Sequence, residues 1–368
     1  MSANAVLLGF GAIGRELARQ LATNARSASR SVKICGVIDR SGFVYGPTGL
    51  SWKRLMELRA HKATGASLAS AEGGCAADPS RAVDTITAAA NRSSSRTVLV
   101  DVTAADTRSY LERAISHGWD IVLANKIPLA GLQVDVERLT ALATKKRIAL
   151  LHEATVGAGL PVIDTLRKLI DSGDRVQSIE GCPSGTLGFL FGELGRGGTF
   201  SEALRRAVDL GYTEPDPRDD LRGTDVARKA LILGRLLGFR GELDDIAVES
   251  LVPPRLESVS RDEFLARIGE VDAAWTTRVT SAASRGCVLR YRVRVTRRAI
   301  AVGLVEVSTG TSLSVLAGTD NQFSFTTSRY RENPLVITGP GAGAAVTAAG
   351  VYNDLLAIAA TTRRRVVA

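Results

Sequence analysis

A glycine-rich turn near the N-terminus constrains the fold of this chain more than any other feature. The turn, Gly9-Phe-Gly-Ala-Ile-Gly14, directly follows Ala5–Leu8, an apolar run typical of a short strand. Residues 15–22 then repeat apolar side chains at helical spacing, and a second apolar run, Val32–Ile38, ends at Asp39. A strand–turn–helix–strand order around such a turn is the context in which it binds a dinucleotide. We therefore expect a Rossmann-type domain at this end of the chain.

The glycines of the turn have separate physical roles. Gly9 permits the tight turn, Gly11 lets the backbone approach a pyrophosphate, and Gly14 allows the helix to pack closely on the strand. The first residues of the helix, Ala12 and Ile13, bring N–H groups that have no partner within the helix and can bind phosphate oxygens. We predict that these five residues bind the cofactor.

The end of the second strand leaves the choice of cofactor open. Asp39 suits the ribose hydroxyls of NAD, whereas Arg40 suits the 2′-phosphate of NADP. Arg40 also fits a solvent-exposed loop. We expect NAD or NADP, with both residues at the cofactor site.

Two further apolar strands lead to the same edge of the sheet. They are Thr97–Thr103 and Asp120–Ala124, and the second delivers Asn125-Lys126. Ligands of open α/β sheets bind beyond the carboxyl ends of the strands, so we expect Thr103 and Lys126 at the cofactor. A lysine that lies along a loop with its charge in water fits this segment equally well. Between the strands, residues 41–81 form a long insertion, in which we expect a helix over 50–62 and otherwise a mobile surface excursion.

An acidic run, Gly211–Lys229, contains five carboxylates and a lysine. Pro215 and Pro217 fix φ and remove two backbone donors, which predicts a rigid, non-helical loop over the first half of the run. A helix is expected from Thr224 to about Leu237, with Thr224 as its N-cap.

Asp225 and Lys229 are four residues apart and should lie on one face of that helix. Most such pairs are solvated surface ion pairs. The rest of this helix is mainly apolar, however, and charges in an apolar environment usually serve a site. We therefore favour a site containing Asp225 and Lys229.

The remaining segments indicate a second domain. Glu153 precedes a glycine-containing turn whose carbonyls could bind Na⁺ or K⁺, although a turn that only packs a domain junction is the simpler interpretation. Alternating strands over 288–295, 299–307 and 323–327 suit a sheet that two subunits could share. Gly339-Pro-Gly-Ala-Gly343 precedes a last helix, and a return of this helix to the first domain would bring Gly341 to the cofactor.

We thus expect an α/β protein with a Rossmann-type nucleotide-binding domain (1–152 with 338–368) and an α+β catalytic and dimerisation domain (153–337). Its net charge of +9 comes mainly from scattered arginines without an aromatic platform, so we expect no nucleic-acid partner. No C-x-x-C spacing, apolar run of membrane-spanning length or signal peptide is present. We expect no membrane association, and a reducing, cytoplasmic location.

The whole chain resembles homoserine dehydrogenase, through an ordered series of motifs. They are Gly9–Gly14, Ala124-Asn-Lys126, Glu153-Ala-Thr-Val-Gly-Ala-Gly-Leu-Pro161, Ser184-Gly-Thr186, Glu214-Pro-Asp-Pro-Arg-Asp-Asp-Leu221 through Lys229, Gly318-Thr-Asp-Asn321 and Asn333–Gly343.

The resemblance implies NAD(P)-linked interconversion of L-aspartate 4-semialdehyde and L-homoserine, a small-molecule substrate, in a homodimer. It implies Lys126 and Lys229 as the catalytic lysines. It also implies that Glu214, Asp220 and Asp225 line the substrate site. The monovalent cation would be held by four residues: Glu153, Val156, Ala158 and Leu160.

Neither an aspartate-kinase segment nor a C-terminal regulatory extension is expected, and therefore no threonine feedback through such a domain. Two alternatives remain open. One is a related oxidoreductase for another amino-acid aldehyde or alcohol, and the other is a non-catalytic nucleotide sensor. A sensor has no need of an acid–base pair such as Asp225 and Lys229.

Overall fold

The computed structural model describes residues 2–24, 31–90 and 96–360. Its contacts divide the chain into two compact units. The first unit comprises Met1–Gly159 with Gly343–Ala368, and the second unit comprises Leu160–Ala342. The structure thus divides the chain at 159/160 and 342/343, whereas the sequence predicted the corresponding boundaries at 152/153 and 337/338.

The first unit is built on a seven-stranded sheet with the order β4-β3-β2-β1-β5-β6-β7. Five neighbouring strands run parallel, in the order β2, β1, β5, β6 and β7. Strands β3 and β4 extend the sheet beyond β2 with antiparallel pairing. In chain order the strands are β1 Ala3–Leu8, β2 Val32–Asp39, β3 Gly42–Tyr45, β4 Gly74–Cys75, β5 Arg96–Asp101, β6 Asp120–Leu123 and β7 Leu150–Leu151.

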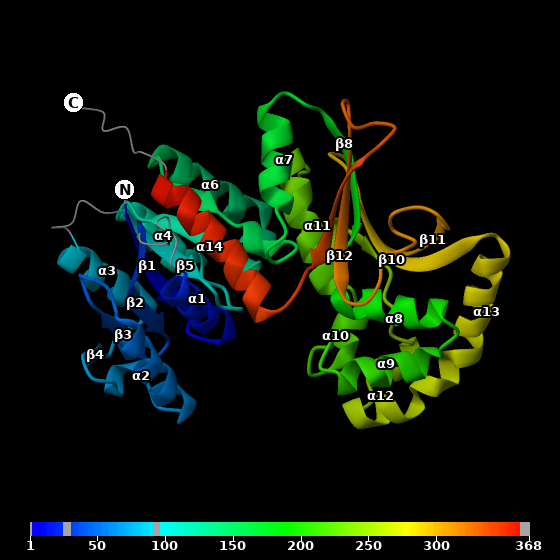
Figure 1. Ribbon diagram of the computed structural model, residues 1–368, viewed down its shortest axis with the longest axis horizontal. Helices are drawn as coiled ribbons and strands as arrows, with labels where there is room; N and C mark the ends of the chain where they lie inside the picture. The colour runs from blue at the N-terminus through cyan, green and yellow to red at the C-terminus, as the bar shows by residue number, and fades with distance from the viewer. Residues whose placement is uncertain (1, 25–30, 91–95, 361–368) are drawn as a thin grey trace. The chain divides into compact units, whose positions relative to one another are not determined.

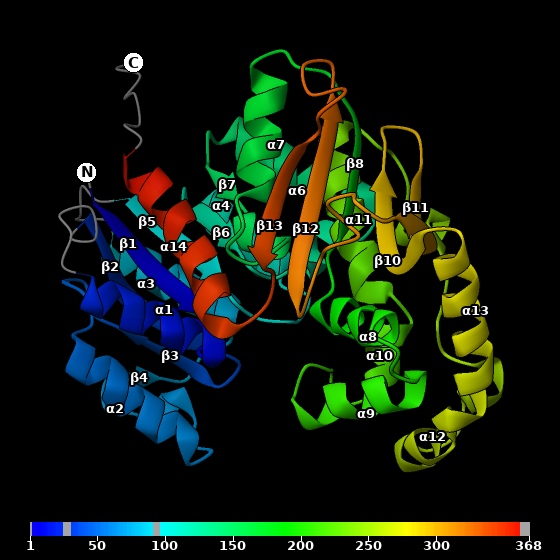
Figure 2. The same ribbon diagram turned by 45° about the vertical axis from the view of Figure 1, so that its right-hand side comes forward.

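Helices cover both faces of this sheet. Helices α1 and α14 contact one face and pack along each other, as Figures 1 and 2 both show, while α3, α4 and α6 form the opposite layer. The helices are α1 Ala12–Thr23, α2 Trp52–Ala63, α3 Pro79–Ala90, α4 Arg108–Ser116, α5 Ile127–Ala130, α6 Gln133–Lys145 and α14 Ala344–Ala360, with 3-10 turns at Leu68–Ser70 and Glu153–Thr155. Buried Leu7, Val100 and Val351 belong to the shared core, so the last helix completes the first unit.

The expectation that residues 41–81 form only a surface excursion is wrong. Strands β3 and β4 extend the sheet, and Leu55, Leu58 and Leu68 are at most 4% exposed. Gly42 has φ +149, and a Cβ there would lie 2.3 Å from the carbonyl oxygen of Cys75. Because only glycine permits this approach, the segment can fold back on β2. The expected helix is present as α2, over Trp52–Ala63.

The second unit contains a six-stranded, mainly antiparallel sheet with the order β13-β12-β8-β10-β11-β9. Helices α8, α11 and α13 contact the face that carries buried Tyr291, Val293 and Val295. Alternation along β10 places Arg292 and Arg294 on the other face. The strands are β8 Val176–Cys182, β9 Ala247–Val248, β10 Cys287–Val295, β11 Ile300–Ser308, β12 Asp320–Thr327 and β13 Leu335–Pro340.

The helices of the second unit lie mainly between β8 and β10 in the chain. They are α7 Val162–Asp171, α8 Gly185–Gly195, α9 Phe200–Asp209, α10 Pro217–Leu221, α11 Thr224–Leu237, α12 Arg261–Arg267 and α13 Asp272–Ser284, with 3-10 turns at Leu243–Asp245, Pro254–Leu256 and Ile268–Val271. The α/β class expected from the sequence is confirmed. Among the helices of the described ranges, none combines the length and apolarity needed to cross a bilayer.

Candidate active site

The glycine turn between β1 and α1 has the geometry of a phosphate-binding turn. Gly9 has φ +95, and its N–H donates to the carbonyl of Ile38 at 2.8 Å. Gly11 is the N-cap of α1 without a side-chain cap, and a Cβ built on it meets nothing within 4 Å. A Cβ on Gly14 would lie 3.0 Å from the carbonyl oxygen of Gly9. The helix start is therefore open to a ligand, whereas the other two glycines are required by the turn itself.

A cavity of about 410 Å³ lies against this turn. Its lining includes Gly9, Asp39, Arg40 and Thr103, four residues that the sequence analysis assigned to the cofactor. It also includes Lys62 of α2, which the sequence analysis missed because its segment was expected to be a surface excursion.

Asp39 accepts hydrogen bonds from two neighbours in this cavity. Its carboxylate lies 2.8 Å from Nζ of Lys62 and accepts from the backbone N–H and Oγ of Ser41 at 2.7 and 2.5 Å. Burial acts to raise the pKa of Asp39, but the bonds from Lys62 and Ser41 outweigh it, so the pKa is lowered. Lys62 thus compensates the negative charge at the end of β2.

A buried polar network joins the ends of β5 and β6. Asp101, 0% exposed, accepts from the N–H and Oγ1 of Thr103 at 3.0 and 2.7 Å, and from Oγ1 of Thr107 at 2.5 Å. Nδ2 of Asn125 donates to Asp101 at 3.0 Å and to the carbonyl of Ala105 at 2.7 Å. Lys126 follows Asn125 directly and stands at the N-cap of α5. Asp101 was not among the site residues predicted from the sequence, although its position at the end of an apolar strand was a usable signal.

The acidic run of the second unit is not the non-helical loop that its prolines predicted. Pro217 opens the short helix α10, and Asp216 caps it by accepting from the N–H of Arg218 at 3.0 Å. Proline is tolerated in the first turn of a helix, because its missing N–H would have no partner there.

Asp220 sits at the centre of this run. One carboxylate oxygen accepts from the N–H of Glu214 and the other from Oγ1 of Thr186, both at 2.8 Å, while the Thr186 hydroxyl also lies 2.5 Å from the carbonyl of Tyr212. Burial raises the pKa of Asp220 against the lowering effect of these two bonds, and the charges of Glu214 and Asp225 raise it further. The side chain of Glu214 belongs to an exposed residue. Thr186 was quoted only as part of a family motif, and its contact with Asp220 could not be read from spacing.

Lys229 is held between a carboxylate and a carbonyl. Its Nζ lies 2.9 Å from Asp225 and donates to the carbonyl of Pro183 at 2.7 Å. The Lys229 side chain is 12% exposed and the Asp225 side chain 48%. The contact expected from their four-residue spacing is therefore present, with one partner enclosed and the other half in solvent.

The helix that carries this pair, α11, spans Thr224–Leu237 as the sequence predicted, but Thr224 is not its cap. The N-cap is Gly223 at φ +71, where a Cβ would lie 2.1 Å from the hydroxyl oxygen of Tyr291. A left-handed residue packed against a ring requires glycine, and this requirement overrides the capping preference of threonine.

The residues predicted to hold a cation follow β7. Glu153, Val156 and Ala158 are buried, and Ala158 adopts φ +55. Gly350 of α14 packs against the carbonyl of Ala158, since a Cβ there would lie 2.5 Å from its oxygen. Within the described ranges, no three or more His, Cys, Asp or Glu side chains are placed so that they could hold a metal ion, so a cation here would rely on backbone carbonyls.

The two units divide the predicted residues between them. The first unit brings the glycine turn, Asp39, Arg40 and Thr103 to one cavity, with Lys126 beside the Asp101 network. The second unit brings together Asp220, Asp225 and Lys229 with Glu214 at their edge, and it also contains Leu160 and Gly341. Gly341 packs on buried Asn321, whose side-chain amide lies 1.9 Å from where a Cβ would be.

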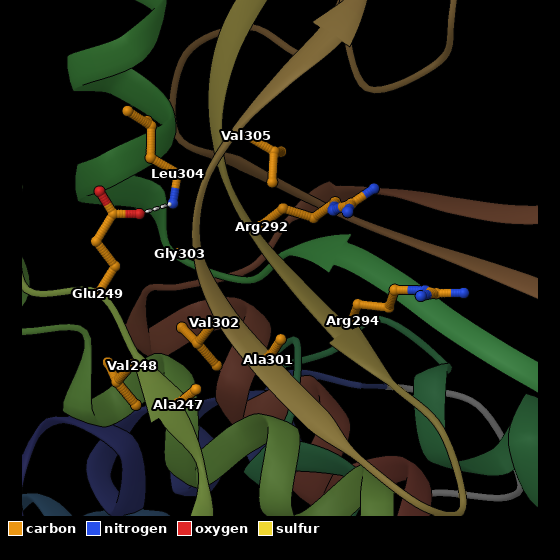
Figure 3. Close-up of a pocket in the computed structure, with 10 residues that line it drawn as sticks. All are labelled: Ala247, Val248, Glu249, Arg292, Arg294, Ala301, Val302, Gly303, Leu304 and Val305. Atoms are coloured by element: carbon orange, nitrogen blue, oxygen red, sulfur yellow. Dashed lines mark hydrogen bonds between the residues drawn. The ribbon is translucent and has the colours of Figure 1, made fainter.

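A second cavity of about 600 Å³ lies on the sheet of the second unit and contains none of the predicted residues. Figure 3 shows Arg292 and Arg294 extending side by side from β10, and Glu249 accepting from the N–H of Leu304 at 2.9 Å.

Comparison with known proteins identifies the family. Residues 9–153 match the family model described as homoserine dehydrogenase, NAD binding domain, and residues 161–356 match the model described as homoserine dehydrogenase. The chain is 42% identical over 273 residues to the homoserine dehydrogenase of Saccharomyces cerevisiae, a match that covers 71% of this chain and 75% of that protein.

Longer relatives match as well. The chain is 37% identical over 359 residues, 95% of its length, to a chloroplastic bifunctional aspartokinase/homoserine dehydrogenase of Zea mays, but spans only 37% of that protein. The bifunctional relatives are thus more than twice as long as the part that this chain matches.

Solved structures agree with the sequence matches. A Candida auris protein of unknown function superimposes with a TM-score of 0.85 at 32% identity, covering 98% of this chain and 99% of that one. A hyperthermophilic archaeal homoserine dehydrogenase in complex with NADPH gives a TM-score of 0.73 at 25% identity, covering 97% of both chains. The two family models together account for most of the sequence, in the order in which the two units occur. The chain belongs to the homoserine dehydrogenase family.

Proposed function

We propose that this protein catalyses the NAD(P)-dependent interconversion of L-aspartate 4-semialdehyde and L-homoserine. The observation that carries the proposal is the enclosed ammonium of Lys229, held by Asp225 and the carbonyl of Pro183 in the same unit as the acidic residues Asp220 and Glu214. An amine with a carboxylate partner, next to further carboxylates, suits a substrate that carries both an ammonium and a reacting oxygen.

The carboxylates would bind the substrate. Glu214 and Asp220 are the proposed acceptors for the ammonium group of homoserine. Thr186 and the N–H of Glu214 hold the Asp220 carboxylate in place, which supports a fixed position for that contact.

The two lysines would assist proton transfer and polarise the substrate. The nicotinamide supplies hydride in the direction of aldehyde reduction and accepts it in the reverse direction. Lys229 would donate a proton to the developing alkoxide oxygen and remove it from the alcohol in the reverse direction, with Asp225 stabilising the protonated amine. Lys126 would orient the substrate and polarise its carbonyl oxygen.

The first unit fits a dinucleotide. The uncapped start of α1, with Gly11, Ala12 and Ile13, would hold the pyrophosphate, and Asp39 with Thr103 would line the adjoining cavity. Arg40 and Lys62 border the same cavity, and Lys62 already neutralises Asp39. Two cations beside one compensated carboxylate favour a 2′-phosphate, so we propose that NADP is accepted at least as well as NAD.

The division of labour and the assembly belong to the same proposal. The nucleotide domain would be the first unit, and the catalytic and dimerisation domain would be the second unit, whose Gly341 would approach the cofactor. The sheet face with Arg292 and Arg294, opposite the helices, is the proposed contact of a homodimer, and the ion pair of Arg292 with Glu180 at 2.7 Å lies on it.

We propose a cytoplasmic enzyme, in agreement with four free cysteines. Na⁺ or K⁺ at Glu153, Val156, Ala158 and Leu160 is the proposed cation site.

Steady-state kinetics with aspartate semialdehyde and homoserine, each with NAD(H) and NADP(H) and with or without Na⁺ or K⁺, test the proposal. We expect cofactor turnover in both directions. Folded protein that turns over neither substrate with either cofactor would refute it.

A further inference from the structure

The Asp101 network determines which groups at the wall of the nucleotide cavity donate hydrogen bonds and which accept them. Asn125 sets the starting point, because its Oδ1 accepts from the backbone N–H of Ile127 at 3.1 Å. Its Nδ2 must then face Asp101 and Thr103, at 3.0 and 3.1 Å. Since a backbone N–H cannot exchange roles with an acceptor, the orientation of this amide is fixed.

The hydroxyl of Thr103 is constrained from both sides. Its single proton is directed to Oδ1 of Asp101 at 2.7 Å. Nδ2 of Asn125 lies 3.1 Å from its oxygen, but the two N–H groups of this amide also face the carbonyl of Ala105 at 2.7 Å and Asp101 at 3.0 Å. A hydroxyl has one donor and two acceptor positions, so at least one acceptor position remains. Thr103 lines the 410 Å³ cavity beside Gly9, where its methyl group would lie 3.0 Å from a Cβ on that glycine. What Thr103 can offer a ligand is therefore an acceptor and not a donor.

We propose that Asp101 is a positioning residue that fixes the Thr103 hydroxyl as a hydrogen-bond acceptor toward the cofactor. The carboxylate is buried, reaches no ligand itself and acts through the hydroxyl that it orients. The group recognised on the cofactor is then a hydrogen-bond donor, which we assign to one of its amino groups. In NAD(P) the donors that differ between available analogues are the amino group of adenine and the amide of nicotinamide. This inference rests on the proposed function, since it requires that the cavity bind the dinucleotide.

The experiment measures dissociation constants for NADH and for two analogues with the complete protein. One analogue carries hypoxanthine in place of adenine, and the other carries an acetyl group in place of the carboxamide, so each lacks one amino donor. The wild type should bind at least one of them about five- to tenfold more weakly than NADH, the loss expected for one hydrogen bond.

Three variants locate the effect. Thr103→Val keeps the shape and removes the hydroxyl, so it should abolish the discrimination. Asp101→Ala removes the acceptor of the Thr103 hydroxyl and leaves its proton free to point toward the cavity, which should reduce or abolish the discrimination as well. Thr103→Ser keeps the hydroxyl and is the matched control that should retain it. Thermal unfolding shows whether each variant is folded, and Thr103→Val alone tests the proposal if Asp101→Ala does not fold.

The outcomes separate this inference from the proposed function. Wild-type protein that binds neither NADH nor NADPH overturns the proposed function. Wild-type protein that binds NADH and both analogues equally overturns the inference alone. Variants that weaken all three ligands by the same factor overturn it too, because that pattern is the one a merely structural role produces.

Discussion

Asp225 lies one helical turn before Lys229 on α11, and their side-chain charges are 2.9 Å apart. The second unit contains another pair of the same types and spacing, Asp164 and Lys168 on α7, with 2.6 Å between the charged atoms. The lysine of the first pair is 12% exposed and that of the second 75%. Enclosure and the additional bond to Pro183, and not the sequence spacing, distinguish the candidate site from an ordinary surface pair.

We predict that Asp225→Asn lowers kcat by about five- to tenfold, since a charge-assisted bond from a half-exposed carboxylate contributes only about 1 kcal/mol. The KM for the cofactor should not change, because Asp225 is not among the residues proposed to hold it. Asp164→Asn is the matched control and should leave both constants at wild-type values. Equal effects of the two substitutions on kcat would argue against a role for Asp225.

We predict that Gly11→Ala separates cofactor binding from stability. Gly11 has φ −79 and open space around its Cβ position, so alanine should leave the melting temperature nearly unchanged. The added methyl group would nevertheless occupy the approach to the pyrophosphate and raise the KM for the cofactor at least tenfold, which corresponds to about 1.4 kcal/mol.

Gly9→Ala is the contrasting variant. Because Gly9 adopts φ +95, alanine there should lower the melting temperature as well as cofactor affinity. Differential scanning calorimetry and cofactor titration measure the two effects. Unchanged cofactor binding in Gly11→Ala would exclude the proposed phosphate turn.

Lys62→Ala tests the cofactor preference. Removal of this ammonium should raise the KM for NADPH by about tenfold or more, since it deletes one of two cations at the cavity, and should affect NADH less. The measured quantity is the ratio of kcat/KM for the two cofactors. Lys53, on the same helix and outside that cavity, provides Lys53→Ala as a control. A ratio that Lys62→Ala leaves unchanged would contradict the assignment.

Asp220→Asn should stabilise the folded protein and at the same time lower its catalytic efficiency. Burial raises the pKa of Asp220 in the folded state, so its ionisation opposes folding. A carboxyl group whose pKa is raised on folding stabilises the folded protein fully at pH values below its pKa in the unfolded chain, which is about 4. This stabilisation is lost as the pH rises through the pKa of the folded state. Asparagine can still accept from the N–H of Glu214 and donate to Oγ1 of Thr186, whose proton then serves Tyr212.

The melting temperature of Asp220→Asn should therefore exceed that of the wild type near neutral pH, and the difference should disappear in acid. At the same time kcat/KM for homoserine should fall, because a neutral amide binds an ammonium poorly. A variant that is less stable at neutral pH would show that the carboxylate contributes to folding.

The sequence was most informative where local chemistry decides the structure. The glycine turn, the strand that ends at Asp39 and both ends of α11 follow from periodicity and from the conformations that glycine permits. The parts that were missed depend on contacts between distant segments. Lys62 reaches Asp39 because β3 and β4 fold back on the sheet, and Thr186 reaches Asp220 across 34 residues of chain. The non-helical loop predicted around Pro217 was wrong because proline can begin a helix as well as interrupt one.

The most direct test of the account is the turnover number of Lys229→Ala, measured across pH against Lys168→Ala. Lys168 has the same i,i+4 aspartate partner but stands in solvent, so its removal should leave kcat at the wild-type value. Loss of a proton donor and acceptor should lower kcat of Lys229→Ala by about 10²-fold or more in folded protein. A kcat near that of the wild type at every pH would contradict the assignment of Lys229 as the group that moves the proton.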